Sequence, residues 1–149
     1  MQHTTRLLFM AGSAREASFN KRLARLAHDV AEANGIAATW VDIGDYPMPI
    51  YDGDLEARDG PPDNARKLKA LFEVHDGIFL ACPEYDASIT PLLKNTIDWI
   101  GRVKEDNGGP STVFKTRVFA IGSAPPGGPG GLGGLPALRP TPLGGPRGP

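Results

Sequence analysis

Residues 7–20 read LLFMAGSAREASFN, and this stretch decides how the rest of the chain is interpreted. It begins with an apolar run that predicts a strand and ends where a helical pattern starts. A strand, a short polar turn and a helix N-terminus in this order form an anion site, because the first helical turn carries unpaired N–H groups and the helix dipole favours negative charge. Hydrogen-bond donors surround that point, on Ser13, Arg15, Ser18 and Asn20. The stretch therefore predicts a phosphate-binding loop.

The same loop has a plainer interpretation. Ser18 alone can act as a helix N-cap, and Arg15 can be a solvated side chain. The position of the loop, directly after the first predicted strand, favours the binding interpretation. The loop is not a Walker P-loop, because no Gly-Lys-Ser/Thr follows, and it is not a G-x-G-x-x-G dinucleotide fingerprint, because only Gly12 is present.

Strand-like and helix-like runs alternate over the first 122 residues. Strands are predicted at 6–11, 37–43, 77–82 and 117–121, helices at 18–34, 63–75 and 91–103, and a long turn at 44–62. This order predicts an α/β fold with a doubly wound parallel sheet. Ligands bind beyond the carboxyl ends of such strands, where residues 12–20, 82–90 and those from 122 onward lie.

Several of the predicted helices and loops carry residues that are typical of ordinary packing or of a solvated surface. In the first helix one face carries the apolar residues Phe19, Leu23, Leu26, Ala27, Val30 and Ala31. The predicted inward residues of the second helix are Ala65, Leu68, Leu71 and Phe72. The acidic residues at 52, 54, 56 and 59 are expected to be solvated, and His3, His28 and His75 are expected at the surface without metal-ligand spacing.

Charge and composition exclude several classes of protein. The net charge of the 149 residues is −1 and the pI is near 6.3, which argues against a nucleic-acid partner. No apolar run approaches the ~20 residues that span a bilayer, and residues 1–6 do not begin an export signal. The only cysteine, Cys82, fits a reducing compartment and is expected to be a core residue rather than a nucleophile. We therefore expect a cytoplasmic protein with no membrane partner.

Residues 124–149 break the pattern, because 8 of these 26 residues are Pro and 9 are Gly. Such a segment cannot bury enough apolar surface to offset its ordering entropy. We expect one domain over residues 1–123 and a disordered Gly/Pro-rich tail over 124–149. With only four recognisable strands the sheet is incomplete, so the fourth strand is expected to be an exposed edge and the chain to be aggregation-prone.

A second loop, residues 83–91 or PEYDASITP, follows the third predicted strand. A Tyr with flanking backbone amides can pack against a flat ring and bond its polar edge, although a surface turn with a half-buried Tyr85 is the commoner outcome. Three motifs taken together resemble the NADPH-dependent FMN reductases, which include chromate and quinone reductases and related azoreductases. They are G-S-x-R-x-x-S-x-N at 12–20, P-E-Y-x-x-S at 83–88 and P-L-L-K-N-T-I-D-W at 91–99.

The resemblance covers roughly residues 6–123, and the C-terminus of the chain is atypical or truncated relative to the family. The resemblance implies a flavodoxin-like fold that binds FMN non-covalently. The implied phosphate contacts are Ser13, Arg15, Ser18 and Asn20, with backbone N–H groups near Phe19. The implied ring contacts are Pro83, Glu84, Tyr85, Asp86 and, after the fourth strand, Ser123. Family members often carry Asn in place of Asp86, and an ionised carboxylate there would disfavour the anionic reduced flavin.

The resemblance also implies the reaction. NADPH or NADH gives a hydride to FMN, and a small-molecule acceptor such as a quinone or free flavin takes the electrons, so no acid–base residue is assigned. Two alternatives stay open: a flavodoxin-like electron carrier without NAD(P)H activity, and a non-functional truncated remnant. The family uses the third helix at a dimer interface, so a homodimer or homotetramer is implied. Trp99 and Ile100 then supply apolar contacts, or the helix has a solvated face with one core aromatic.

Overall fold

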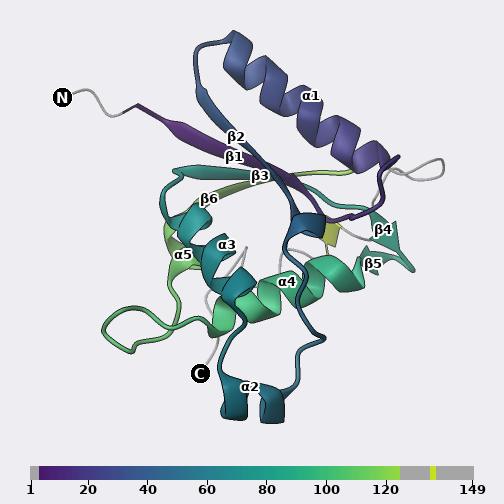
Figure 1. Cartoon of the computed structure of the whole chain (residues 1–149). Coiled ribbons are helices and arrows are strands. Elements are labelled where there is room, and N and C mark those ends of the chain that lie inside the picture. Colours follow the sequence, from purple (N-terminus) through teal and green to yellow (C-terminus); the bar gives the residue numbers. More distant parts are fainter. Residues whose placement is uncertain (1–3, 125–134, 137–149) are drawn as a thin grey trace.

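The computed structural model describes residues 4–124 and 135–136 (Figure 1). The predicted disordered tail lies outside the described residues except at positions 124, 135 and 136, and His3 also lies outside them. No helix in the described part of the chain is both long and apolar enough to cross a membrane.

Four parallel strands form the central sheet. They are β1 (Arg6–Ala11), β2 (Ala37–Asp42), β3 (Gly77–Ala81) and β6 (Val118–Gly122), in the spatial order β2-β1-β3-β6. Each predicted strand is confirmed to within one residue at either end. The order is that of the first four strands of a flavodoxin-like sheet, in which the ligand site lies between the first and third strands.

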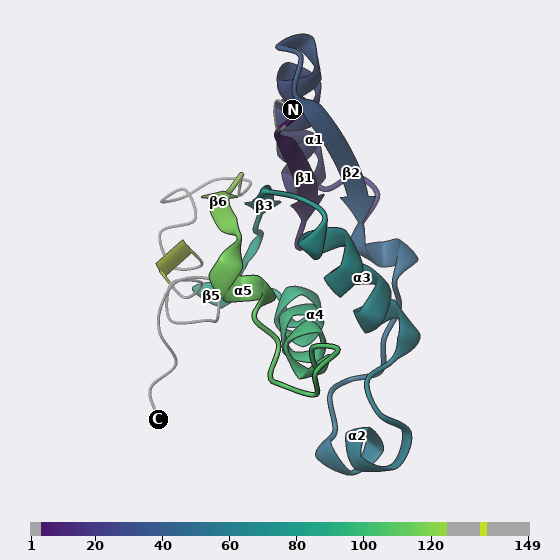
Figure 2. The same ribbon diagram turned by 90° about the vertical axis from the view of Figure 1, so that its left-hand side faces the viewer.

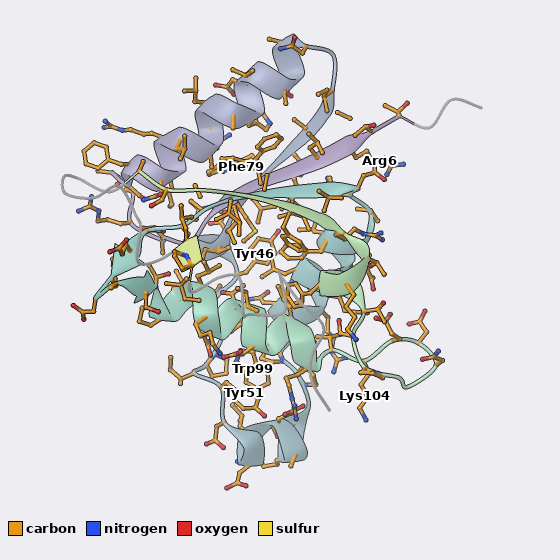
Figure 3. The ribbon with its side chains drawn as sticks, turned by 180° about the vertical axis from the view of Figure 1, so that it is seen from behind. Arg6, Tyr46, Tyr51, Phe79, Trp99 and Lys104 are labelled. Carbon is orange, nitrogen blue, oxygen red and sulfur yellow. The ribbon has the colours of Figure 1, made fainter. Side chains whose placement is uncertain are left out.

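Helices cover both faces of the sheet (Figures 1 and 2). One face carries α1 (Phe19–Ala33), and the other carries α3 (Asp63–Glu73), α4 (Pro91–Arg102) and the short α5 (Val113–Thr116). The two central strands are apolar on both faces because each face is covered. Leu8 and Leu80 belong to the large core on the α3–α4 side, whereas Ala11, Phe79 and Ala24 of α1 pack together on the other side, where Figure 3 labels Phe79.

The apolar face assigned to α1 is wrong in part. Phe19, Leu26 and Val30 are exposed by 46%, 62% and 54%. The buried residues of the helix are Asn20, Ala24, His28 and Ala31, of which the predicted face included only Ala31. Small and polar side chains line this face because α1 lies close against the strands and also forms one wall of the site described below. After the C-cap residue Asn34, Gly35 takes a φ of 76°, the left-handed conformation that glycine favours.

Both described histidines are buried, so the surface assignment is wrong for each. His28 packs edge-to-face on Phe9, with ring centroids 5.7 Å apart. His75 has one ring nitrogen 2.6 Å from the Leu71 carbonyl oxygen and the other 2.8 Å from Thr39 Oγ1. One ring nitrogen of His28 lies 3.0 Å from the Asp29 carboxylate, so each buried ring has a polar partner, which explains how it is accommodated in a core.

The predicted long turn at 44–62 contains two short elements, η1 (Ile43–Asp45) and α2 (Gly53–Asp59). The Asp52 carboxylate caps α2 by accepting from the backbone N–H of Asp54 and Leu55. Glu56 is paired rather than simply solvated, because Tyr51 and Arg102 both donate to its carboxylate at 2.8 Å. The bond between Glu56 and Arg102 holds α2 against the end of α4.

Trp99 is fully buried, and its Nε1 donates to the Pro49 carbonyl at 2.7 Å. Its ring lies 5.0 Å from that of Tyr51, measured between centroids, and Figure 3 labels the two neighbours. Ile100 is also fully buried. The interpretation of Trp99 as a core aromatic is therefore confirmed, and Ile100 is buried as well, so neither residue offers an apolar contact to a second chain.

Candidate functional site

A pocket opens at the carboxyl edge of the sheet, where the loops after β1, β3 and β6 meet the N-terminus of α1. Its empty volume is about 560 Å³, a figure that includes the space of the open mouth. Its lining residues are Ser13, Arg15, Ser18, Phe19, Asn20, Pro83, Glu84, Tyr85 and Ala124. The fold thus brings together eight residues that the sequence singled out, while Asp86 and Ser123 lie beside the pocket rather than in its lining.

Donors gather at the end of the pocket beside α1. Ser18 is the N-cap of the helix, since its Oγ accepts from the Lys21 backbone N–H at 3.4 Å. The hydroxyl hydrogen of Ser18 remains available to a ligand, so capping and binding are compatible roles for this residue. The Ser13 Oγ accepts from the Arg15 N–H at 3.2 Å, and the exposed Arg15 guanidinium also donates within the loop, to the Ala17 carbonyl.

Asn20 reaches the pocket, but its carboxamide is engaged by the protein. Its Oδ1 accepts from the Ala124 N–H at 3.0 Å, and its Nδ2 donates to the Ala124 carbonyl at 3.3 Å. The sequence implied a phosphate contact for this side chain, and it gave no sign of a partner 104 residues away.

The three loops are joined by short hydrogen bonds between their backbones. The Gly12 N–H donates to the Ala81 carbonyl, and the Cys82 N–H donates to the Gly122 carbonyl, each at 2.8 Å. The Ser123 hydroxyl donates to the Cys82 carbonyl at 2.9 Å. The two backbone bonds continue the sheet pairing past the ends of the strands, and all three bonds hold together the loops that border the pocket.

Thr90 lies outside the pocket lining but joins two of the segments that border the pocket, and the sequence reasoning did not single it out. Its buried hydroxyl donates to the Gly12 carbonyl at 2.6 Å and accepts from the Leu93 N–H at 3.2 Å, which makes it the N-cap of α4. The available signal was Thr before Pro91 at a helix start, which is typical of an N-cap. A Cβ on Gly12 would lie 3.0 Å from the Leu93 side chain, so a larger residue at position 12 would require Leu93 to shift.

A short hairpin, β4 (Glu84–Tyr85) and β5 (Ser88–Ile89), forms the outer wall of the pocket. Its two turn residues, Asp86 and Ala87, have φ values of 49° and 58°, the left-handed values of a two-residue hairpin turn. Tyr85 is 55% exposed and lines the pocket mouth. The Tyr85 ring is therefore accessible to a flat ligand.

Cys82 follows β3 but takes no part in the pocket lining. Its side chain is buried, and burial raises the pKa of the thiol to about 11. Its burial confirms the assignment as a core residue, and a thiol with so high a pKa stays protonated at neutral pH, where it is a poor nucleophile.

Comparison with known proteins identifies the family. The sequence profile described as NADPH-dependent FMN reductase matches residues 5–142. A quinone reductase of Escherichia coli K12 is 30% identical over 126 residues, which cover 83% of this chain and 66% of the relative. A 2-hydroxy-1,4-benzoquinone reductase of Burkholderia sp. is 34% identical over 122 residues, covering 80% of this chain and 64% of the relative.

Solved structures agree with the sequence relatives. FerB, a flavoenzyme NAD(P)H:(acceptor) oxidoreductase from Paracoccus denitrificans, superposes with a TM-score of 0.74 at 26% identity, over 93% of this chain and 71% of FerB. The fold and the pocket define a flavodoxin-like α/β protein with a pocket at its switch point. The chain belongs to the NADPH-dependent FMN reductase family. It spans slightly less than two thirds of the length of the curated relatives described above.

Proposed function

We propose that this chain is an FMN-dependent NAD(P)H oxidoreductase that passes electrons to quinones, free flavin or similar small acceptors. The observation that carries the proposal is the meeting of eight motif residues around one pocket at the N-terminus of α1. Family membership supports the same reaction class.

The chemistry of the pocket fits FMN. One end offers the Ser13 and Ser18 hydroxyls, the Arg15 guanidinium and the N–H groups of the first turn of α1, a donor set that matches a phosphate. The other end offers the backbone of residues 83–85 and the exposed Tyr85 ring, which suit a flat polar ring.

The bound flavin would supply the transfer of two electrons, and the chain's residues would hold and orient it. Arg15 balances the charge of the phosphate, while the bonded loop backbones keep the ring edge in a fixed place. Asp86 acts as a turn residue in this account, because its backbone has a positive φ and it lies outside the lining.

The test is steady-state oxidation of NADPH and of NADH by the full chain, reconstituted with FMN, with a benzoquinone as acceptor. We expect oxidation that needs both FMN and the quinone, and about a tenfold or larger loss of apparent FMN affinity in Arg15→Ala. A chain that binds FMN but oxidises neither nucleotide would instead be an electron carrier. A chain that cannot be loaded with FMN would favour the non-functional remnant.

Assembly and location belong to the same proposal. We propose a homodimer or homotetramer whose interface uses residues other than Trp99 and Ile100, because both are fully buried within one chain. A cytoplasmic location is supported by the single free, buried Cys82. Sedimentation analysis of the purified chain measures the oligomeric state, and cell fractionation measures the location.

A further inference from the structure

We propose that Asn20 is a positioning residue, which fastens the loop after β6 to the N-terminus of α1 and thereby sets one wall of the pocket. In this role its carboxamide affects flavin binding through Ala124 rather than by touching the phosphate. The inference rests on the proposed function for its link to flavin, while the fastening itself is a property of the chain alone.

The geometry at Asn20 uses both ends of the carboxamide. Oδ1 accepts from the Ala124 N–H at 3.0 Å and Nδ2 donates to the Ala124 carbonyl at 3.3 Å, and Asn20 is only 4% exposed. A pair of bonds to one backbone unit fixes the orientation of that unit as well as its position. The side chain lies on the same buried face of α1 as Ala24, so the helix holds it rigidly.

The loop after β6 needs such a contact at this point. The pairing of β6 with β3 ends at Gly122, opposite Ala81. Beyond it the Ser123 hydroxyl reaches the Cys82 carbonyl, and Asn20 then holds Ala124. The next residue, Pro125, has no N–H with which to form a further ladder bond. Asn20 therefore holds the one residue of this loop that lines the pocket within the described part of the chain.

The two possible roles of the carboxamide predict different ligand dependence. A side chain that contacts the phosphate contributes to FMN binding and not to the binding of riboflavin, which lacks the phosphate. A side chain that positions a pocket wall contributes to both ligands by the same factor. Arg15, which lines the donor end of the pocket, provides the matched control for a phosphate contact.

The experiment measures dissociation constants of the full chain for FMN and riboflavin by flavin fluorescence, in wild type, Asn20→Ala and Arg15→Ala. We expect Asn20→Ala to weaken both flavins about tenfold, and Arg15→Ala to weaken FMN alone. Amide hydrogen exchange at Ala124, measured without flavin, should be faster in Asn20→Ala and unchanged in Arg15→Ala. An FMN-specific loss in Asn20→Ala, or unchanged exchange at Ala124, would overturn the proposal.

A second variant guards against loss of folding. Asn20→Asp keeps an acceptor for the Ala124 N–H, so the exchange rate at Ala124 should be closer to the wild-type rate than it is in Asn20→Ala. An exchange rate as high as in Asn20→Ala would count against the proposal. If wild type binds neither flavin, the proposed function fails, and the exchange rate at Ala124 alone then decides whether Asn20 positions the loop.

Discussion

At the scale of single residues, Thr90 shows how one hydroxyl links the two loops of the pocket. Thr90 is 3% exposed, and its hydroxyl donates to the carbonyl of Gly12, the residue after β1, and caps α4. A buried hydroxyl that both donates and accepts holds two elements at a fixed separation. Thr90 therefore stabilises the protein and shapes the site at the same point.

Thr90→Val should destabilise the protein by about 1–3 kcal/mol, because it removes a helix cap and leaves the Gly12 carbonyl without its donor. Thr90→Ser keeps the hydroxyl and is the matched control. Urea denaturation of both variants measures the difference. Equal midpoints for the Val and Ser variants would show that the hydroxyl is unimportant.

Local motifs predicted most of the pocket lining, because the phosphate loop and the ring loop are each continuous in sequence. The contacts of Asn20 with Ala124 and of Thr90 with Gly12 were not predicted. Their partners lie 104 and 78 residues away, and no local pattern encodes such distant contacts. The resemblance implied a ring contact for Asp86, and its positive φ in a tight turn is a further feature that the motif did not predict.

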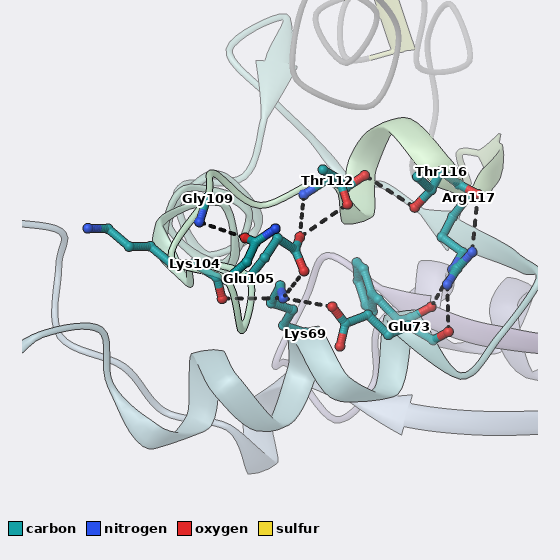
Figure 4. A network of polar contacts seen from close by, with 10 residues as sticks. Lys69, Glu73, Lys104, Glu105, Gly109, Thr112, Thr116 and Arg117 are labelled. Carbon is teal, nitrogen blue, oxygen red and sulfur yellow. Dashed lines mark hydrogen bonds and ion pairs between the residues drawn. The ribbon is translucent and has the colours of Figure 1, made fainter.

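At the scale of elements, a buried lysine joins α3 to the segment after α4 (Figure 4). Lys69 Nζ lies 2.7 Å from Glu73 and 3.1 Å from Glu105. The Glu105 carboxylate also accepts from the Thr112 N–H at 2.6 Å. Burial disfavours the Lys69 cation, but its bonds to Glu73 and Glu105 outweigh this effect and raise its pKa. The network ties the start of α5 to α3.

Lys69→Met should destabilise the protein by about 1–3 kcal/mol at pH 7. The pKa of Glu105 is lowered from 4.5, first by the Thr112 N–H and then by Lys69. Its stabilising effect is therefore present above pH 4.5 and is lost as the pH falls through the lower folded value. The difference in melting temperature between Lys69→Met and wild type should therefore become smaller below that pH. Thermal melts at several pH values measure it.

Lys67→Met, an exposed change on the same helix, is the control for this pH dependence. It should lower the melting temperature little, and its difference from wild type should not depend on pH in this way. A gap for Lys69→Met that stays constant down to acid pH would rule out the Glu105 pairing as its cause.

The hairpin of β4 and β5 carries strain at Ala87, where φ is 58°. A left-handed conformation costs a non-glycine residue about 1–2 kcal/mol, so Ala87→Gly should stabilise the protein by about 1 kcal/mol. Denaturant midpoints measure the effect. Ala17→Gly, at an exposed turn without a positive φ, should not stabilise, and the same gain there would remove the backbone explanation.

The elements differ in how well sequence predicted them. The strands were placed closely because β1 and β3 are apolar runs covered on both faces. Helix α2 was missed because none of its residues is buried and its anchor, the Glu56–Arg102 pair, spans 46 residues. The inward face of α1 was misassigned because small and polar residues, rather than large apolar ones, face the sheet and pocket.

At the scale of the whole molecule, β6 pairs with β3 on one side, and no strand lies on its other side within the described residues (Figure 2). Val118 on this strand is 74% exposed. An open edge with an exposed β-branched residue favours pairing between chains. The expected tendency to aggregate therefore has a specific location in the fold.

Val118→Lys should slow the aggregation of the full chain, since a charge on an edge strand opposes pairing. Light scattering at fixed protein concentration measures the rate, and far-UV circular dichroism checks that the fold is kept. Val30→Lys, which adds the same charge at an exposed site on α1, is the control. Equal slowing by both variants would point to net charge rather than to the β6 edge.

The central claim is that the pocket holds FMN with its phosphate at the N-terminus of α1. Calorimetric titration of the flavin-free wild-type chain with FMN and with riboflavin tests this claim most directly. We predict that FMN binds at least about tenfold more tightly, because charge-assisted bonds from the donor end act only on the phosphate. Equal affinity for the two flavins, or no binding of either, would contradict the claim.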